Sequence, residues 1–503
     1  SAASDVYKRQ TYRYFANDNL MNIEEEKTRL FELDNTAPEV EIIYAYDGLF
    51  INQNVEIMGF AQDKNFYRWK LEYRNKELPG WMVITDWQEN EIREENGEHG
   101  LGLFKASELE NGVYVIRLTA EDLVYNRGVY EIELKVGEPV RDLELTGYLK
   151  PKGVWGGDYI YIADSYHKRI VKTNEENELL LDIRQFQPND VYVDEEGNIY
   201  ATDLDSKVYV YNSDGERLRT ISGHLHPKGI EVREEGIYVA DTYKDRIIVY
   251  SHTGEIIKEI EVEKHPSGIA VDNEGNIFTC LSETSEIRGY NKEGEEILRY
   301  GVLGHSSGEF IRSVDIDVDE KGFLWVCDRN NNRIHMIDWQ RGLDLLIIGR
   351  EGADNPMNKP EGLGIEEEDG KVKYLYVADT NNDRVLRYNL TMVSSTRDLG
   401  AASIMADALQ IEQFLPYPNP TNAESRIRVV LNQSAEIEIN IWTITGKLVY
   451  NYRAQGTTGI NEFMWTGRNN EGNAVLNGVY NIQVIAKNNT GRVERWSKIA
   501  IIR

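Results

Sequence analysis

The chain has 503 residues, and its 85 Asp and Glu residues against 56 Lys and Arg residues give a formal net charge of −29. A chain of this length forms several domains, and its 41% hydrophobic share and 30 tyrosines exclude an intrinsically disordered protein. The acidic balance excludes nucleic-acid backbones and anionic lipid surfaces as expected partners. No run approaches the ~18 apolar residues of a membrane-spanning helix, so no membrane span is expected.

The first ten residues, SAASDVYKRQ, lack the apolar core of a secretory signal. Their last six letters resemble the translation of a sequencing-library adapter, so residues 1–10 are interpreted as an artefact and the chain as a fragment of a longer protein. Residues 11–35 are then expected to be the remnant of an upstream segment or a linker. On this interpretation a signal peptide and upstream domains have been lost.

Residues 36–138 predict a β-sandwich, because short alternating strands are separated by turn residues from Thr36 onward. The stretch ENGVYVIRLTAEDLVYNRG resembles the end of the bacterial immunoglobulin-like or fibronectin-type modules of large secreted proteins. The resemblance implies an immunoglobulin-like spacer that positions the next domain. A ligand-binding role for this module is the alternative.

A short phrase then returns six times between Tyr148 and Gly400, each time as an apolar run, a small residue, an acid, a tight turn and a base. The copies read YIADSYHKRI, YATDLDSKV, YVADTYKDRI, FTCLSETSEI, WVCDRNNNRI and YVADTNNDRV. The acidic slots are 39, 38, 40, 47 and 51 residues apart and hold Asp164, Asp203, Asp241, Leu281, Asp328 and Asp379. A period near 40 with strand and turn chemistry predicts a β-propeller.

Five of the repeats open on an entry punctuated by proline or glycine, namely PKGV, PNDV, PKGI, PSGI and PEGL, and the repeats continue with four short strands separated by turns such as DEEGN. The pattern resembles the NHL family of six-bladed β-propellers, whose repeat has the form PxGIAVDxxGNIYVADxxNxRI. The resemblance implies an all-β chain with a six-bladed NHL β-propeller at residues 139–401, flanked by two immunoglobulin-like β-sandwiches. We also predict that residues 141–147 supply an outer strand to the sixth blade and so close the ring.

The acid of the repeat and the base five residues later are predicted to pair within one hairpin. The pairs are Asp164 with Arg169, Asp241 with Arg246, Asp328 with Arg333, and Asp379 with Arg384. The second repeat offers Lys207 to Asp203, and the fourth loses both charges together. Joint loss is expected of a structural ion pair, because removing one partner of a buried pair costs about 3–5 kcal/mol. The acids are therefore interpreted as structural rather than catalytic.

The two cysteines, Cys280 and Cys327, occupy the same slot in the fourth and fifth repeats. Equivalent positions on neighbouring blades are expected to lie farther apart than the roughly 7 Å that a disulfide allows between Cα atoms. Two buried free thiols that act as small core residues are therefore expected. Neither cysteine has a histidine nearby in the sequence, so a metal or nucleophile role is disfavoured.

Ligands of β-propellers usually meet the face where loops between blades converge on the central channel, so residues entering each first strand are candidates. The predicted ligand-binding residues are Trp155, Asn189, Asp190, Lys228, Ser267, Arg312 and Glu361. They would form a mixed polar ring that suits binding. They lack a recognisable nucleophile, base and orienting group, so no residue is assigned a catalytic role.

The alternative is an enzyme, a lyase or hydrolase that acts at the channel mouth. Some NHL-like propellers are lyases that hold zinc with histidines just after the entry proline. In this chain those slots hold Asn189, Lys228, Ser267 and Glu361. Three histidines on nearby loops, His226, His265 and His305, are candidates for a metal, although solvated side chains are the favoured interpretation. No cofactor is therefore expected; zinc is disfavoured, and the Asp, Asn and Gly turns leave calcium open.

Residues 416–503 carry ten Lys and Arg against six Asp and Glu, unlike the acidic remainder. The entry YPNP at 417, the hairpin TGK at 445, the segment WTGRN at 465 and the turn NGVY at 477 resemble the type IX secretion system C-terminal sorting domain, whose immunoglobulin-like fold is shared with the flagellar-hook cap family. The resemblance implies export from a Bacteroidota-like bacterium through the type IX secretion machinery. An ordinary sandwich without a sorting role is the alternative, and residues 402–415 are expected to be a linker.

These observations together predict a secreted protein, located in the extracellular space or on the outer cell surface. Its propeller is expected to bind an extracellular protein or glycan, and the protein is expected to be a monomer. Binding is favoured over catalysis because the candidate ring offers charge and hydrogen bonds but no nucleophile.

Overall fold

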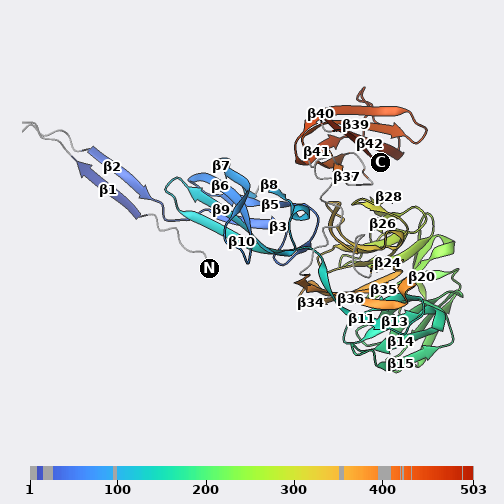
Figure 1. Ribbon diagram of the computed structural model, residues 1–503. Helices are drawn as coiled ribbons and strands as arrows, with labels where there is room; N and C mark the ends of the chain where they lie inside the picture. Colours follow the sequence, from blue (N-terminus) through green and yellow to red (C-terminus); the bar gives the residue numbers. More distant parts are fainter. Residues whose placement is uncertain are drawn as a thin grey trace, which may run out of the picture. The chain divides into compact units, whose positions relative to one another are not determined.

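The computed structural model describes residues 8–14, 27–94, 99–349, 356–394, 409, 411–417, 419, 421, 424–431, 433–489 and 491–501 (Figure 1). The regular structure of these residues consists of β-strands and short 3-10 helices, and none of the helices is long and apolar enough to cross a membrane. The chain divides into two compact units, with the first unit formed mainly by residues 1–135 and the second by residues 136–503.

The first unit opens with a β-hairpin. Strand β1 (Lys8–Tyr14) pairs antiparallel with β2 (Lys27–Leu33), so that Lys8 lies opposite Leu33. Most of this hairpin falls in the stretch that was expected to be an upstream remnant.

Two sheets follow and form the predicted sandwich. One sheet holds β3 (Glu39–Tyr44), β5 (Val55–Gln62) and β8 (His99–Phe104). The other includes the neighbouring strands β10-β9-β6-β7, with bounds β6 (Phe66–Asn75), β7 (Met82–Gln88), β9 (Gly112–Asp122) and β10 (Arg127–Val136). Ile57 from the first sheet and Leu71 and Leu118 from the second are fully buried. Because strand side chains alternate between faces, such residues give each sheet one apolar face to bury.

Within the second unit, the described residues between Pro139 and Val393 form six four-stranded antiparallel sheets. The first three are β12 (Pro151–Trp155), β13 (Ile160–Asp164), β14 (Arg169–Thr173), β15 (Leu179–Arg184); β16 (Pro188–Val193), β17 (Ile199–Asp203), β18 (Lys207–Tyr211), β19 (Arg217–Ser222); and β20 (Pro227–Arg233), β21 (Gly236–Asp241), β22 (Arg246–Tyr250), β23 (Ile256–Glu261). The next two are β24 (Pro266–Val271), β25 (Ile277–Leu281), β26 (Glu286–Tyr290), β27 (Glu296–Tyr300); and β30 (Ser313–Val318), β31 (Leu324–Asp328), β32 (Arg333–Asp338), β33 (Leu343–Ile348).

The sixth sheet combines strands from both ends of the propeller. Its order is β11-β36-β35-β34, with bounds β11 (Pro139–Thr146), β34 (Gly362–Glu368), β35 (Lys371–Asp379) and β36 (Arg384–Val393). In its register Glu144 lies opposite Leu386 and Thr146 opposite Arg384. The prediction that the segment before the first blade closes the ring is therefore confirmed.

The first strands of the six sheets contact one another in sequence, and β34 contacts β12 to complete the ring, so the domain is a six-bladed β-propeller. Apolar clusters join neighbouring blades: one combines Tyr161 and Ile170 of the first blade with Val191 and Ile199 of the second. A short parallel pair, β28 (Val302–Leu303) and β29 (Glu309–Phe310), lies between the fourth and fifth sheets in the chain.

The DEEGN turn shows why the sequence makes a hairpin between the first two strands of a blade. Gly197 has φ +80° and its N–H bonds to the carbonyl of Asp194, whose side chain accepts the N–H of Asn198. A residue with a Cβ adopts this left-handed conformation less easily. The turn therefore needs both its acid and its glycine.

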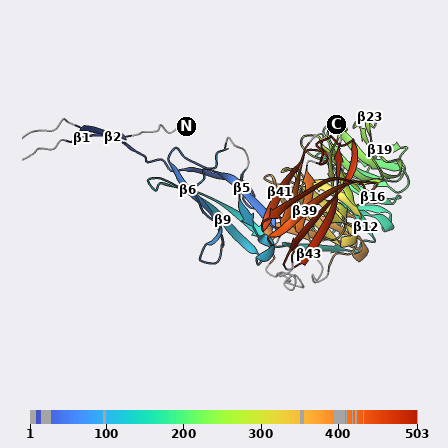
Figure 2. The same cartoon turned by 90° about the horizontal axis from the view of Figure 1, so that it is seen from above.

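The C-terminal domain is a second sandwich, of which Figure 2 shows several strands. One sheet holds β37 (Ile411–Tyr417), β38 (Ser425–Leu431) and β41 (Gly459–Trp465); the other has the order β40-β39-β42-β43, with bounds β39 (Ala435–Thr443), β40 (Leu448–Gly456), β42 (Gly478–Asn488) and β43 (Gly491–Ile501). Its core includes Trp465, Ile439 and Val484. Strand β37 begins inside the segment expected to be a linker, and the prolines of the YPNP entry lie outside the described residues.

Candidate functional site

The entry ends of the inner strands surround a polar recess in the propeller channel. Each inner strand begins at or beside the entry of its repeat, so the residues after each entry converge on the channel. The recess is lined by Lys152, Asn189, Asp190, Lys228, Gly229, Gly268, Arg312, Val314, Asp315, Arg329 and Glu361. Its volume is about 60 Å³, which leaves room for a few water molecules or one small polar group.

The structure brings five of the seven predicted ligand-binding residues into this recess: Asn189, Asp190, Lys228, Arg312 and Glu361. The other two lie elsewhere. Trp155 packs edge-on against Tyr161 and Tyr192, and the hydroxyl of Ser267 donates to the carbonyl of Cys280. Those two positions support blade packing rather than the channel surface.

Sequence reasoning missed three polar residues of the recess: Lys152, Asp315 and Arg329. Lys152 occupies the same slot as Lys228 in the matching entries PKGV and PKGI, so the repeat alignment could have found it. Arg329 comes from the 3-10 turn after the second strand of the fifth blade, which gives no signal in the entry pattern.

Four cations, Lys152, Lys228, Arg312 and Arg329, line the recess together with the carboxylate of Glu361. Arg329 Nε lies 2.8 Å from Glu361 Oε1, and Lys152 Nζ lies 3.8 Å from Glu361 Oε2. Lys152 Nζ also donates to Asn189 Oδ1 at 3.2 Å. The side chain of Lys228 has no hydrogen bond or ion pair among the described residues, and neither has that of Arg312.

The surroundings lower the pKa of both lysines. Burial lowers the pKa of Lys152, and burial together with the positive charge of Lys152 and Arg312 lowers the pKa of Lys228 to about 8. Glu361 has a lowered pKa because burial, which acts against ionisation, is outweighed by Lys152 and Arg329. A lysine with a pKa near 8 can hold or release a proton close to neutral pH.

Two carboxyl groups, Asp190 and Asp315, lie in the same recess on the second and fifth blades, which are opposite positions in a ring of six. Asp190 accepts the N–H groups of Val191 at 2.8 Å and Ile230 at 3.1 Å, while Asp315 accepts that of Leu363 at 2.8 Å. A Cβ on Gly153 would collide with Asp190. Glycine at this inner position therefore leaves room for the carboxyl group.

Burial raises the pKa of Asp190 to about 7, against the lowering effect of its two backbone donors. It also raises the pKa of Asp315, with the charge of Asp190 adding to the effect. The pKa of Asp317, the next acid along β30, is raised by burial as well. The recess thus combines acids that favour their protonated form with a cationic mouth.

The three histidines proposed as metal candidates have other surroundings. His226 stacks on Tyr243 with ring centroids 4.9 Å apart, and His265 packs edge-on against the same ring at 5.1 Å. His265 Nδ1 also lies 2.8 Å from Glu283 Oε1. The backbone carbonyl of His305 accepts a hydrogen bond from Arg333.

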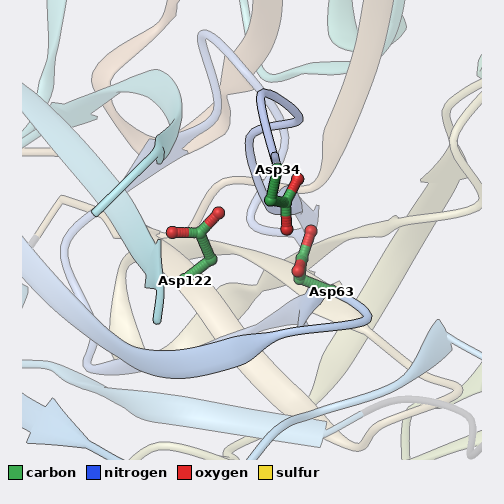
Figure 3. Close-up of side chains that lie close together, drawn as sticks. All are labelled: Asp34, Asp63 and Asp122. Carbon is green, nitrogen blue, oxygen red and sulfur yellow. The ribbon is translucent and has the colours of Figure 1, made fainter. Parts of the chain in front are cut away.

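The described residues hold one group of three possible metal ligands, Asp34, Asp63 and Asp122 of the first unit (Figure 3). Their ligand atoms lie within 4.8 Å of one another. Asp34 accepts hydrogen bonds from Thr36 and Asn65, and the buried Asp122 accepts them from backbone N–H groups of its own turn. Burial raises the pKa of Asp63, and the charges of Asp34 and Asp122 add to this.

Each of the four predicted Asp–Arg pairs is present in its hairpin. The Arg Nε to Asp Oδ2 distances are 2.7 Å for Arg169–Asp164, 3.1 Å for Arg246–Asp241, 3.0 Å for Arg333–Asp328 and 2.6 Å for Arg384–Asp379. The other oxygen of each acid accepts a backbone N–H from the segment that enters the blade, from Leu149, Leu225, Ile311 or Asn358. The acids therefore fasten the entry segment to the hairpin.

The second and fourth blades deviate from this scheme as their sequences suggest. Asp203 accepts the backbone N–H groups of Asp205 and Lys207. In the fourth blade Leu281 is fully buried, and Glu286 pairs with Arg288 at 2.8 Å. In the fourth blade, an ion pair between Glu286 and Arg288 is therefore present in place of the Asp–Arg pair of the first, third, fifth and sixth blades.

Both cysteines are buried free thiols, which confirms the sequence prediction. Cys280 Sγ donates to the carbonyl of Asp315 at 3.5 Å and Cys327 Sγ to that of Pro360 at 3.1 Å. Burial raises the pKa of both thiols well above the ordinary value.

Two family models match parts of the chain. Residues 144–307 match the SMP-30/gluconolactonase/LRE-like region, and residues 419–490 match the FlgD Ig-like domain. A search among curated proteins finds no match to this chain.

Three solved structures illustrate the likeness of the propeller. Virginiamycin B lyase from Staphylococcus aureus has 14% identity and a TM-score of 0.38, covering 49% of this chain and 98% of that chain. A gluconolactonase from Xanthomonas campestris has 15% identity and a TM-score of 0.39, covering 50% and 88%. Regucalcin, a calcium-binding protein from Agrobacterium tumefaciens, has 10% identity and a TM-score of 0.38, covering 49% and 93%.

At such low identities and TM-scores, the likeness to these structures carries no argument about what the chain does. The matched family models and the strand topology agree on the classes of two of its domains. The chain carries a β-propeller with an SMP-30/gluconolactonase/LRE-like region, followed by an FlgD Ig-like domain.

Proposed function

We propose that this chain is a secreted or surface-attached binding protein that uses the mouth of its propeller channel to hold an extracellular protein or glycan. The observation that carries the proposal is the recess itself, which gathers four cations and several hydrogen-bonding groups from different blades. Its 11 lining residues include no Ser, Thr, Cys or His, the side chains that most often act as nucleophile and base. Such a lining suits recognition.

The test is a binding screen of the purified chain against glycan and protein arrays, repeated with Lys228→Met. The expected result is at least one ligand whose binding falls about tenfold or more in the variant, a loss of about 1.4 kcal/mol. Ligands that bind wild type and variant alike would place the binding surface elsewhere and contradict the proposal.

A second candidate function is a lyase or hydrolase acting in the same recess. Two observations favour it: residues 144–307 match a family model that includes gluconolactonases, and the pKa values of Lys228 and Asp190 lie near neutrality. A base and an acid of this kind can move protons without a nucleophile. Turnover of lactone or lyase substrates that is lost in Lys228→Met, measured with and without a chelator, would favour the enzyme.

We also propose that the propeller is of the NHL type and that the C-terminal domain is a type IX sorting signal. Six repeats, of which four have a PxG entry and four an Asp–Arg pair, support the first statement. The match of residues 419–490 to an FlgD Ig-like domain, and the four sequence landmarks, support the second. A fluorescent protein fused to residues 409–503 should leave cells of a bacterium with this secretion system and stay inside a secretion-deficient strain.

A further inference from the structure

We propose that the channel mouth recognises a small ligand through a single oxyanion, a carboxylate or phosphate group, held by Lys228 and Arg312. The inference rests on the proposed function, because it names the chemistry of the ligand that the same recess would take. It is carried by the balance of charge and hydrogen bonding at the mouth.

The charges at the mouth do not cancel. Four cations face one ionised acid, Glu361, and that acid already lies 2.8 Å from Arg329 and 3.8 Å from Lys152. The pair with Arg329 joins the fifth blade to the entry of the sixth. Glu361 therefore compensates the two cations beside it and leaves the charges of Lys228 and Arg312 without a partner.

The unpartnered side chains come from two different blades, the third and the fifth. Lys228 is half-buried on β20 of the third blade, whereas Arg312 is exposed just before β30 of the fifth blade. Burial and the neighbouring positive charges lower the pKa of Lys228 to about 8, so its charged form lacks compensation. A bound oxyanion would supply the missing negative charge and would accept charge-assisted hydrogen bonds from both side chains.

Two further acids that line the recess, Asp190 and Asp315, do not repel such a ligand as two ordinary carboxylates would. Asp190 and Asp315 are held by backbone N–H groups and have raised pKa values, which favours the protonated form at acidic to neutral pH. A protonated carboxyl group can donate a hydrogen bond to an oxyanion. The acid of the mouth that stays ionised is Glu361, whose pKa is lowered.

Size and total charge select against large polyanions. A recess of about 60 Å³ takes a head group rather than a whole sugar ring. The chain carries a net charge of −29, which repels a long polyanion that follows the surface. A single small anion feels chiefly the charges within a screening length of about 8 Å at physiological salt. The structure thus favours one anionic group on an otherwise neutral or small ligand.

The experiment is isothermal titration calorimetry of the full chain with three probes: galacturonate, inorganic phosphate and the neutral sugar galactose. We expect one equivalent of at least one anionic probe to bind, with galactose at least tenfold weaker than galacturonate where the latter binds. Galacturonate without phosphate assigns a carboxylate, phosphate alone assigns a phosphate, and both assign a general oxyanion site. Binding of neither anion overturns the inference.

Two variants locate the site. Lys228→Met and Arg312→Gln should each weaken the anion at least tenfold, while Lys447→Met, at an exposed lysine of the C-terminal domain, should leave it unchanged. Circular dichroism of each variant checks that it is folded. Anion binding that survives both substitutions would overturn the inference, as would polygalacturonate binding more tightly per chain than galacturonate.

The outcome also separates this inference from the proposed function. If array ligands depend on Lys228 but are neutral, and no anion binds, the channel mouth is a binding site and the oxyanion assignment is wrong. If no array ligand depends on Lys228 and no anion binds, both fail.

Discussion

Arg329 and Glu361 form an ion pair of 2.8 Å between the fifth blade and the entry of the sixth, and the pair lies at the mouth of the channel. It links blade assembly to the charge of the recess, because Glu361 is also the nearest acid to Lys152. The same carboxylate therefore affects stability and ligand binding.

Glu361→Gln should lower the free energy of unfolding by about 1–3 kcal/mol, since it leaves Arg329 without its ionised partner. It also removes one negative charge from the mouth. Inorganic phosphate should consequently raise the melting temperature of the variant more than that of the wild type. Equal shifts in calorimetric scans at several phosphate concentrations would contradict the link between this acid and the charge of the recess.

Asp241→Ala should lower the free energy of unfolding by about 1–3 kcal/mol, because it frees the N–H of Leu225 and leaves Arg246 with Glu259 as its remaining partner. Urea unfolding followed by tryptophan fluorescence gives the value. Asp214→Ala, at an exposed turn of the second blade, is the matched control. Its free energy of unfolding should differ from that of wild type by less than about 0.5 kcal/mol. An unchanged melting temperature for Asp241→Ala would refute the structural role of this acid.

The contribution of Asp190 to stability should fall as the pH rises from about 4 to about 7, because its folded pKa is about 7 against an ordinary value of 3.8. Between these values the folded protein binds the proton that the unfolded chain releases, so the penalty grows up to the folded pKa and is constant above it. Asp190→Asn removes this ionisation penalty. The variant should therefore be more stable than wild type by on the order of a few kcal/mol at pH 8 and by much less at pH 4. The same difference in stability between Asp190→Asn and wild type at pH 4 and at pH 8 would contradict a raised pKa for Asp190.

Leu145→Ala should lower the free energy of unfolding by about 2–5 kcal/mol, as expected when a large apolar side chain is removed from a core. Leu145 is 2% exposed on β11 and packs with Val385 in the cluster that joins the first and sixth blades. Leu149→Ala, whose side chain is 37% exposed a few residues later, should have little effect. Similar losses for both variants would argue that closure by β11 adds nothing specific.

Cys280 and Cys327 should react with iodoacetamide only as fast as the propeller unfolds. Both thiols are buried, and their raised pKa values disfavour the reactive thiolate. Mass spectrometry of alkylated peptides at increasing urea should show both cysteines labelled along the unfolding curve. Rapid labelling of either cysteine in native buffer would contradict this.

Much of the fold could be predicted from the repeat, since the acid, the turn and the base recur at intervals that match four strands. The Asp164–Arg169 hairpin and its counterparts follow from local spacing, and closure by β11 follows from the need to complete the sixth sheet. Turn chemistry and strand alternation are local properties, which is why the sequence displays them.

The recess was harder to predict because its geometry depends on the register within each inner strand. A register shift follows the first residue of the inner strand in the first five blades, as between Pro151 and Val154 or between Ser313 and Asp315, and such a shift changes which side chain points to the channel. Lys152 therefore lines the recess where Trp155 was expected. Arg329 reaches it from a turn distant in sequence from Glu361, a contact that only the folded ring creates.

The closing strand has a consequence for how the propeller is made. β11 leaves the ribosome before any other strand of the ring, yet its partner β36 is more than two hundred residues further along the chain. Until that partner is available, β11 has an unpaired edge, and exposed edges recruit other strands. The first strand of the ring to be synthesised is thus among the last to be paired. Because contacts between residues distant in sequence form slowly, we expect the pairing of β11 with β36 to be a slow step in the folding of the propeller.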